Sequence, residues 1–480
     1  MSASGGPLRV MKFGGTSVGD PQRMAASAST IQEYAARGRW VVVVSALQRV
    51  TTALLSAAQA ATRGETAAWR AVGEELRQRH TEVCDQLVAP AERAAVEAQL
   101  DAQLAKFGEI CLGFALLGEA TPRALDSLAS LGEVMSASLL AATLRARGLA
   151  AESVDATELI VTDDNHGNAT LLFEPTNQRV RARLGPLLER PVIPVVTGFR
   201  AASREGHCTT LGRGGSDYSA TILGATLPAS EIWIWTDVAG MMTADPQQVP
   251  QAQVIPQLSY REAIELSFFG ARILHPKALD LPLLAGIPVR IRNSFDPHAQ
   301  GTEIGAAAPT PSAVTALAAT SEASLFTVSG VRSIPFARLA AHVFAALDAD
   351  GIRTLVVTQS SAENIISLVV GSADAQRVRR RLERERVSLR GSTSIAAVDE
   401  VDEVGVVVAV GEGIQVVPST AARILSAVAD REIGIRTIAQ GSSGLSISLV
   451  VDNARVSQAV AAMHQEFGLD RVPPPRLPLD

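Results

Sequence analysis

Aromatic residues and cysteines are scarce in this sequence of 480 residues. Phenylalanine, tryptophan and tyrosine together make up 4 % of it, whereas all apolar residues make up 47 %. The cores must therefore consist mainly of Ala, Val, Leu and Ile, which is typical of layered α/β folds with buried strands. The three cysteines, Cys84, Cys111 and Cys208, are too few and too widely spaced for a disulfide framework or a cysteine metal site. This usage predicts a reduced, cytoplasmic protein.

Charge of one sign and long apolar runs are also lacking. The formal net charge is -6, which argues against a broad nucleic-acid surface. The basic stretch RVRRRLERER at residues 377–386 is interrupted by Glu383 and Glu385 and has no aromatic residue, so we interpret it as a solvated helix face. No apolar run approaches a membrane span, and the first residues, MSASGGP, lack the features of a signal peptide. We therefore expect no nucleic-acid partner and no membrane association.

Short apolar runs alternate with longer helical stretches up to about residue 300. The runs that read as buried strands lie at residues 8–13, 40–45, 191–199, 231–237 and 289–293. Between the second and the third, residues 53–148 read as several helices. This alternation predicts a mostly parallel sheet with helices on both faces, in which ligands bind at the carboxyl ends of the strands. The length predicts roughly two to four domains.

The composition changes near residue 305, where AAAPTPSAVTALAAT is rich in small residues, contains proline and is weakly patterned. We place a domain boundary there. Beyond it the chain repeats itself, because residues 343–370 align with residues 424–451 at an offset of 81. Each copy reads helix, strand, polar turn and strand, followed by a further helix. A repeat of this length predicts a duplicated small α/β module.

A lysine lies near the end of the first apolar run, in LRVMKFGGTSVGD at residues 8–20. Lys12 at the mouth of a buried strand is costly unless an anion lies near it, and the glycines after it let the backbone approach a bulky ligand. Gly14 and Gly19 have the spacing of the usual phosphate loop, but Asp20 follows instead of Lys-Ser or Lys-Thr. The segment is therefore a phosphate site of another kind, or not a phosphate site.

A second glycine-rich loop occurs in TTLGRGGSDYSATILGA at residues 209–225. Arg213 lies among glycines, and Ser216 and Asp217 open a helical pattern. The free N–H groups of a helix start and a guanidinium together form an anion site. The alternative is a plain turn with a Ser or Asp helix cap. Two such loops in one α/β domain, each with its own cation, favour a phosphate site.

The order of these and other motifs resembles that of aspartate kinases. The motifs are KFGGTSVGD, VVVVSALQRVTTALL, SLGEVMSASLLAATL, TTLGRGGSDYSA, WTDVAGMMTADP and FGARILHP. The resemblance covers essentially the whole chain and implies a three-layer α/β/α amino-acid kinase domain with a mostly parallel sheet at residues 1–305. The repeated modules are similar to a tandem pair of ferredoxin-like ACT regulatory domains, which we place at residues 320–398 and 399–480.

The resemblance implies a role for each matching residue. Lys12 would meet the transferring phosphoryl group, and Asp217 would orient Lys12 or a metal-bound water near the phosphates. Glu133 matches the residue that binds the substrate's α-amino group, and Arg213 the one that holds its α-carboxylate, with complementary charge in both cases. The other positions expected to line the amino-acid site are Ser45, Thr51 and Ser216. The positions expected to contact ATP, besides Lys12, are Gly14, Gly15, Thr16, Thr236, Asp237, Met242, Gln247, Arg272 and Ile273.

Four of these residues have a simpler interpretation. Ser45 could end a strand, Thr51 could cap the helix that follows, and Asp217 could be only a helix cap. Glu133 lies in a helical pattern and, taken alone, is better interpreted as an exposed glutamate.

Three positions depart from the pattern of the family. The family commonly has tyrosine at Met242, arginine at Gln247 and lysine at Arg272, all expected near the nucleotide. A methionine can pack on an adenine face, Arg272 keeps the positive charge and Gln247 loses one. These departures concern the nucleotide contacts and leave the reaction unchanged. His275-Pro276 reads as a helix stop.

The reaction implied by the resemblance is ATP and L-aspartate giving ADP and 4-phospho-L-aspartate. Mg²⁺ would be bound through the nucleotide phosphates, with no metal held by the protein alone. A carboxylate nucleophile needs alignment and charge neutralisation rather than a general base. The alternatives are a related kinase for acetylglutamate, glutamate or a nucleoside monophosphate, a non-catalytic sensor, and the kinase half of a fusion with homoserine dehydrogenase. The segments around Glu133 and Thr51 argue against the first, and the presence of Lys12, Arg213 and Asp217 argues against the second.

Each module carries a glutamine at a strand end, Gln359 and Gln440, at equivalent positions of the repeat. Glutamine can both donate to and accept from an amino acid's polar groups, whereas the alternative is two polar hairpin turns. The spellings TQSSAENIIS and AQGSSGLSIS resemble those of threonine-sensitive kinases, so the resemblance implies feedback inhibition by L-threonine, with lysine second. It also implies a homodimer through the modules, or a higher homo-oligomer.

Overall fold

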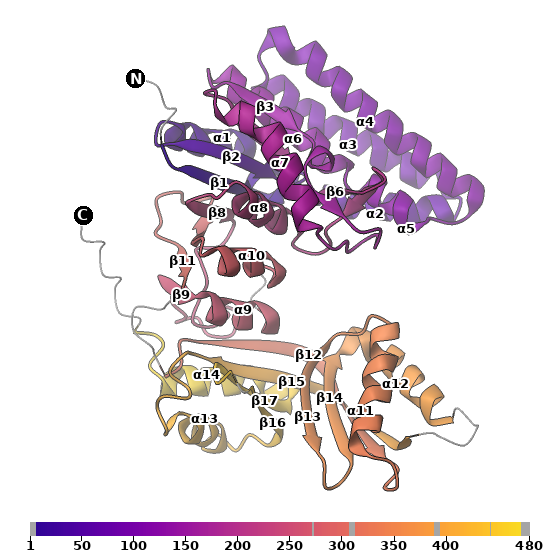
Figure 1. Cartoon of the computed structure of the whole chain (residues 1–480), viewed down its shortest axis with the longest axis vertical. Coiled ribbons are helices and arrows are strands. Elements are labelled where there is room, and N and C mark those ends of the chain that lie inside the picture. The colour runs from indigo at the N-terminus through magenta and orange to yellow at the C-terminus, as the bar shows by residue number, and fades with distance from the viewer. Residues whose placement is uncertain (1–5, 271–272, 307–312, 388–393, 442, 472–480) are drawn as a thin grey trace. The chain divides into compact units, whose positions relative to one another are not determined.

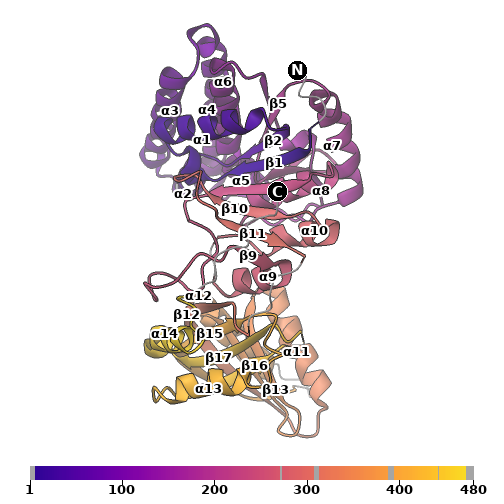
Figure 2. The ribbon, with the colours of Figure 1, turned by 90° about the vertical axis from the view of Figure 1, so that its left-hand side faces the viewer.

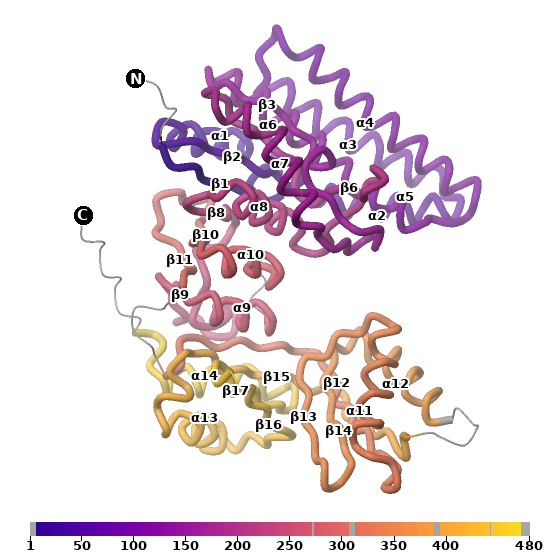
Figure 3. Tube along the Cα trace, viewed as in Figure 1, coloured from indigo at the N-terminus to yellow at the C-terminus, as the bar shows by residue number. Residues whose placement is uncertain are grey.

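The computed structural model describes residues 6–270, 273–306, 313–387, 394–441 and 443–471. Its contacts divide the chain into two compact units, through which Figure 3 traces the backbone. The first unit comprises Met1–Met241, Pro256–Tyr260 and Ile273–Ala307, and the second comprises Met242–Ile255, Arg261–Arg272 and Ala308–Asp480. The boundary expected near residue 305 stays a prediction, but two segments that precede it, residues 242–255 and 261–272, belong to the second unit.

An eight-stranded sheet forms the centre of the first unit (Figure 1). Its order is β3-β5-β2-β1-β8-β10-β11-β9, and every pair is parallel except β10 with β11. The strands are β1 (Leu8–Phe13), β2 (Arg39–Val44), β3 (Ala151–Val154), β5 (Ile193–Thr197), β8 (Glu231–Thr236), β9 (Gln257–Ser259), β10 (Val289–Asn293) and β11 (Thr302–Gly305). All five predicted strands are in this sheet, so the mostly parallel α/β fold is confirmed.

Helices cover both faces of this sheet. The face that carries Met11 and Phe13 packs on a layer formed by α1 to α6, and the opposite face contacts α7 and α8. Local signals set helix starts: Asp20 caps α1 by accepting a hydrogen bond from the Arg23 N–H (2.8 Å). The helices of this unit are α1 (Pro21–Ala35), α2 (Val50–Thr62), α3 (Thr66–Leu87), α4 (Pro90–Leu117), α5 (Pro122–Ala129), α6 (Leu131–Ala146), α7 (Phe173–Leu188), α8 (Gly215–Thr226) and α10 (Lys277–Ala285). A small sheet of β4 (Val161–Thr162), β6 (Arg200–Ser203) and β7 (Cys208–Thr210) adjoins them. Helix α9 (Tyr260–Phe269) belongs to the second unit except for its first residue.

One stretch within the described residues, Pro122–Ala146, is long and apolar enough to cross a membrane by length and composition. Inside the unit, 83 % of its most apolar window is buried, which is the behaviour of a core helix. The expectation that no apolar run approaches a membrane span is corrected by this one buried stretch.

A six-stranded antiparallel sheet forms the second unit, in the order β13-β14-β12-β15-β17-β16 (Figure 2). The elements are β12 (Ala316–Gly330), α11 (Phe336–Ala349), β13 (Thr354–Ser360), β14 (Ile365–Gly371), α12 (Ser372–Val387), β15 (Ile395–Val410), α13 (Thr420–Ala429), β16 (Ile435–Gln440), β17 (Ser446–Asp452) and α14 (Val456–Glu466). The two copies of the repeat are α11-β13-β14 and α13-β16-β17, and each packs on a hydrophobic core of its own.

The two modules share their long central strands. Residues 316–320 of β12 pair with residues 406–410 of β15, and residues 323–330 pair with residues 395–404, with register shifts between the halves. The first half of β12 therefore completes the sheet of the second module. The module division expected at 398/399 falls inside β15. Strand pairing between distant segments decides where the modules meet, and a repeat in the sequence does not reveal that pairing.

Candidate active site

Lys12 and Asp217 form a buried ion pair. Alternation along β1 turns Met11 and Phe13 toward one helical layer and Lys12 toward the other, where α8 begins. The Lys12 Nζ lies 2.6 Å from Asp217 Oδ1, with the two side chains 10 % and 11 % exposed. Asp217 lies in the first turn of α8, whose cap residue is Gly214. The interpretation of Asp217 as only a helix cap is therefore wrong, because its carboxylate pairs with a lysine from the strand.

The first glycine loop lies between β8 and the loop after β2. The Gly14 N–H donates to the Trp235 carbonyl (3.2 Å). A Cβ at Gly15 would lie 3.0 Å from the Ala46 carbonyl oxygen, closer than most side chains tolerate. Thr16 follows, half-buried, in the 3₁₀ turn Gly15–Val18. Glycine lets the first glycine loop pass close to the loop after β2 and to the Lys12 side chain.

The second glycine loop is tighter still. Gly212 and Gly214 have φ of +76° and +70°, and a Cβ at Gly214 would lie 2.4 Å from the Cβ of His275. Between them Arg213 is exposed and has no hydrogen bond or ion pair among the described residues. Ser216 is half-buried at the start of α8. The Arg213 guanidinium therefore lies at the start of α8 without an anionic partner among the described residues, which suits a bound anion.

Glu133 is buried. It lies in the first turn of α6 with 3 % of its surface exposed. Its Oε2 has no hydrogen-bond partner among the described residues. Burial raises the pKa of Glu133 to about 7, against the opposing effects of the Ala46 and Glu133 N–H groups and of the Arg200 charge. A buried carboxylate with a free oxygen suits a cationic group of a ligand.

The interpretation of Glu133 as an exposed glutamate is therefore wrong. The segment LGEVMSASLLAATLRA is apolar on nearly all sides, and residues 131–144 are buried with the exception of Val134. A helix that is apolar all round is a core helix. The sequence therefore held the signal for burial.

Ser45 and Thr51 frame the loop that carries Ala46. Ser45 follows β2 directly, and its N–H donates to the Phe13 carbonyl (3.1 Å), so the interpretation as a strand end holds. Thr51 lies inside α2, whose cap residue is Arg49, so Thr51 is not the cap. Both side chains are half-buried.

The expected nucleotide contacts do not all lie in one unit. Thr236 ends β8 with its hydroxyl 3.2 Å from the exposed Asp237 carboxylate, and Ile273 is half-buried in the same unit. Met242 packs against the core of the second module, and Gln247 is exposed beside it in sequence. Arg272 lies outside the described residues. Met242 and Gln247 therefore stay predicted nucleotide contacts that belong to the second unit.

His275-Pro276 marks a helix start, so the predicted helix stop is wrong. Helix α9 ends at Phe269, and Pro276 is the residue before α10. Proline is favoured near the beginning of a helix because its missing N–H has no partner there.

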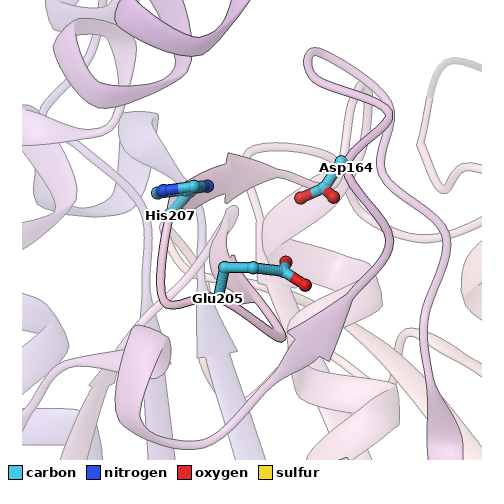
Figure 4. Close-up of side chains that lie close together, drawn as sticks. All are labelled: Asp164, Glu205 and His207. Carbon is cyan, nitrogen blue, oxygen red and sulfur yellow. The ribbon is translucent and has the colours of Figure 1, made fainter.

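Three side chains in the first unit could share a metal ion: Asp164, Glu205 and His207, whose ligand atoms all lie within 4.8 Å of one another (Figure 4). The two carboxylates are exposed, and Glu205 already accepts a hydrogen bond from Ser203 (3.0 Å). Exposed groups of this kind are common without a metal, and we assign none here.

Gln359 and Gln440 occupy equivalent places in the second unit. Each is exposed on an edge strand of the sheet, Gln359 on β13 opposite Ile366 and Gln440 on β16 opposite Ile447. The edge strands approach one another, since the hydroxyls of Thr358 and Thr437 lie 3.2 Å apart.

Comparison with known sequences identifies both parts of the chain. The amino acid kinase family matches residues 7–293, and an ACT domain matches residues 407–467. A bifunctional aspartokinase/homoserine dehydrogenase from Haemophilus influenzae is 31 % identical over 95 % of this chain, which covers 56 % of that protein. Aspartokinase 2 of Arabidopsis thaliana is also 31 % identical over 95 % of this chain, with 84 % of the relative covered. The chain thus spans about half the length of the bifunctional relatives that it matches.

Solved structures agree with these matches. Aspartokinase III of E. coli in complex with aspartate and ADP superposes with a TM-score of 0.84 at 27 % identity, covering 96 % of this chain and 99 % of that one. The same protein in complex with lysine and aspartate gives a TM-score of 0.77 at 28 % identity, with the same coverage. The fold, the motifs and these likenesses lead to one conclusion: the chain belongs to the amino acid kinase family, among the aspartokinases, with an ACT-containing C-terminal region.

Proposed function

We propose that this protein transfers the γ-phosphoryl group of ATP to the β-carboxylate of L-aspartate, giving ADP and 4-phospho-L-aspartate. The observation that carries the proposal is the buried Lys12–Asp217 pair, which joins the strand before the first glycine loop to the helix after the second. Glu133 is linked to the same place through Ala46, whose N–H donates to Glu133 and whose carbonyl lies against Gly15. The likeness to an aspartokinase in complex with aspartate and ADP supports it.

The residues divide the work by charge. Glu133 takes the α-ammonium of aspartate and Arg213 its α-carboxylate, while Ser45, Thr51 and Ser216 line the space between them. The β-carboxylate is ionised at neutral pH and attacks the γ-phosphorus without a base, and the bond to the ADP oxygen breaks. Lys12 offsets charge on the transferring group, and Asp217 holds Lys12 in place. A Mg²⁺ ion carried by the ATP phosphates would supply further charge neutralisation, and Asp217 would hold a water bound to that ion.

A hydroxylamine-trapping assay tests this proposal directly. The purified protein with ATP, Mg²⁺ and L-aspartate is expected to form aspartyl hydroxamate, because an acyl phosphate reacts with hydroxylamine. L-Glutamate and N-acetylglutamate serve as controls and are expected to give none. Hydroxamate formed from either control in preference to aspartate would replace aspartate as the substrate.

A homodimer through the second unit is the expected assembly. The edge strands β13 and β16 carry exposed apolar residues at equivalent repeat positions, Val357 (41 % exposed) and Ile438 (46 % exposed). Unpaired strand edges with apolar residues favour pairing with another chain. Light scattering at micromolar protein is expected to give twice the chain mass, and Val357→Arg with Ile438→Arg is expected to shift it toward monomer. A monomeric wild type with full activity and regulation would contradict this assembly.

Feedback inhibition by L-threonine is the expected regulation, with lysine as the alternative effector. The E. coli structure in complex with lysine and aspartate supports an amino-acid effector, and the threonine choice rests on the sequences around Gln359 and Gln440. The effector must bind an inactive arrangement more tightly than the active one. Gln359→Ala or Gln440→Ala is expected to weaken inhibition about tenfold, the usual effect of losing one hydrogen bond to a charged ligand, with uninhibited turnover unchanged. Separate titrations with threonine and lysine check this, and inhibition by lysine alone would overturn the threonine choice.

A further inference from the structure

Arg79, which belongs to none of the sequence motifs, joins the first glycine loop to the loop between β2 and α2. It lies on α3, in the layer of helices outside the sheet, with 26 % of its side chain exposed. One guanidinium nitrogen, Nη2, donates to the carbonyl of Gln48 (2.8 Å) and to the carbonyl of Gly19 (3.3 Å). Its other contact is a long one, with Nη1 3.9 Å from Glu75. The guanidinium is therefore directed at the backbone of both loops.

The two carbonyls belong to the first glycine loop and to the loop between β2 and α2. Gly19 closes the first glycine loop, and Gln48 lies in the loop between β2 and α2. The loops pack closely, since a Cβ at Gly15 would lie 3.0 Å from the Ala46 carbonyl oxygen and 3.5 Å from the Gln48 Cα. The loop between β2 and α2 also presents the Ala46 N–H to Glu133. A shift of Gln48 would therefore move both the expected phosphate loop and the expected aspartate contacts.

The loop after β2 contains a backbone conformation that costs energy. Arg49, next to Gln48, has φ of +68°, the left-handed region that a non-glycine residue adopts at an energetic cost. The outer side of the loop after β2 faces an open hollow of about 620 Å³. This hollow is lined by Gln48, Arg49, Thr52, Ala53, Ser56, Glu75 and Arg79. From α3, Glu75 and Arg79 line this hollow, and Arg79 donates to the Gln48 carbonyl (2.8 Å).

We propose that Arg79 is a positioning residue: it holds the first glycine loop and the loop at residues 45–49 in register, so that the phosphoryl donor and the acceptor carboxylate are aligned. This role rests on the proposed aspartate kinase activity. Arginine suits it because the planar guanidinium is fixed in geometry, whereas a lysine ammonium is a mobile point charge. Because the hollow is open, water can satisfy both carbonyls when Arg79 is removed. The fold then survives, and the loss falls on alignment.

The test compares Arg79→Ala with a matched control, Arg77→Ala. Arg77 lies on the same helix and pairs with Asp101 on α4, away from both loops. We expect Arg79→Ala to lower kcat about tenfold or more, with the KM for ATP within about threefold of wild type, because misalignment of reacting groups acts on the transition state. Arg77→Ala is expected to keep the wild-type kcat. Arg79→Lys, which keeps the charge on a more mobile ammonium, is expected to fall between them and serves if Arg79→Ala does not fold.

Hydrogen–deuterium exchange separates this role from the proposed function. Faster exchange is expected in peptides covering residues 14–19 and 45–52 of Arg79→Ala and not of Arg77→Ala, whatever reaction the protein catalyses. An inactive wild type with this exchange pattern would overturn the proposed function and leave the loop contact intact. Unchanged exchange in these peptides, or faster exchange with wild-type kcat, would overturn the role of Arg79.

Discussion

Replacing Lys12 by alanine is expected to lower kcat by about two orders of magnitude or more, the usual loss when a preorganised charge is removed from an active site. Lys12 lies at the end of a central strand with its ammonium 2.6 Å from Asp217, so its position is fixed before substrate binds. A positive charge held in this way needs no reorganisation as charge develops on the transferring phosphoryl group. Turnover at saturating aspartate and ATP is the measurement.

The ion pair requires a control, because Lys12→Ala leaves the carboxylate of Asp217 buried without a cation. Removing one member of a buried pair destabilises a protein by about 3–5 kcal/mol. The double variant Lys12→Met with Asp217→Asn removes both charges and keeps the volume, so it is expected to be folded and equally inactive. Recovery of turnover in the double variant would mean that the stranded carboxylate, and not the missing lysine, caused the loss. Near wild-type turnover in folded Lys12→Ala would remove Lys12 from the mechanism.

The sequence predicted those parts of the fold that depend on local patterns. Five apolar runs became strands of one sheet, because a run of Val and Ile buried on both faces is compatible with little else. The two glycine loops were visible for the same reason, since a positive φ at Gly212 and Gly214 and a close approach at Gly15 exclude other residues. The family resemblance then placed Lys12 and Asp217 at one site, although 204 residues separate them in the chain.

The features that the sequence did not reveal depend on contacts between distant segments. The sharing of β12 and β15 between two modules follows from strand pairing, which the sequence of neither repeat reveals. The packing of residues 242–255 with the second unit, although they precede the expected boundary near residue 305, depends on such contacts too. Arg79 is one of several arginines on a polar helix, and only the folded chain shows that it donates to two loop carbonyls.

Glu133→Gln is expected to raise the KM for aspartate about 10- to 100-fold, the cost of losing one charge-assisted hydrogen bond in a buried site. The KM for ATP is expected to stay near the wild-type value, because Glu133 is proposed to bind the α-ammonium of aspartate and not the nucleotide. Glu92→Gln is the matched control. Glu92 lies on α4 and pairs, at a partly exposed place, with Arg145, which lies on α6 like Glu133. Equal changes in both KM values would mean that Glu133 acts through domain closure instead.

The raised pKa of Glu133 gives this prediction a second readout. At pH 6 the free enzyme holds Glu133 largely protonated, and aspartate binding must release that proton; at pH 8 the carboxylate is already formed. The KM for aspartate is therefore expected to fall as pH rises from 6 to 8 in the wild type and to stay flat in Glu133→Gln. Stability follows the opposite sign. A glutamate whose folded pKa of about 7 lies above its unfolded value of 4.5 loses stability as pH rises between them.

Glu133→Gln is therefore expected to be more stable than the wild type at pH 8, by roughly 3 kcal/mol at about 1.4 kcal/mol for each pKa unit. A variant that binds aspartate worse and yet resists urea better separates function from folding, because a merely structural glutamate would lose stability when changed. Urea unfolding at pH 8 and pH 5 measures this difference, which should shrink at the lower pH. A less stable Glu133→Gln at pH 8 would show that the ionised carboxylate supports the fold, and the role of Glu133 in binding the ammonium group would then lose its physical basis.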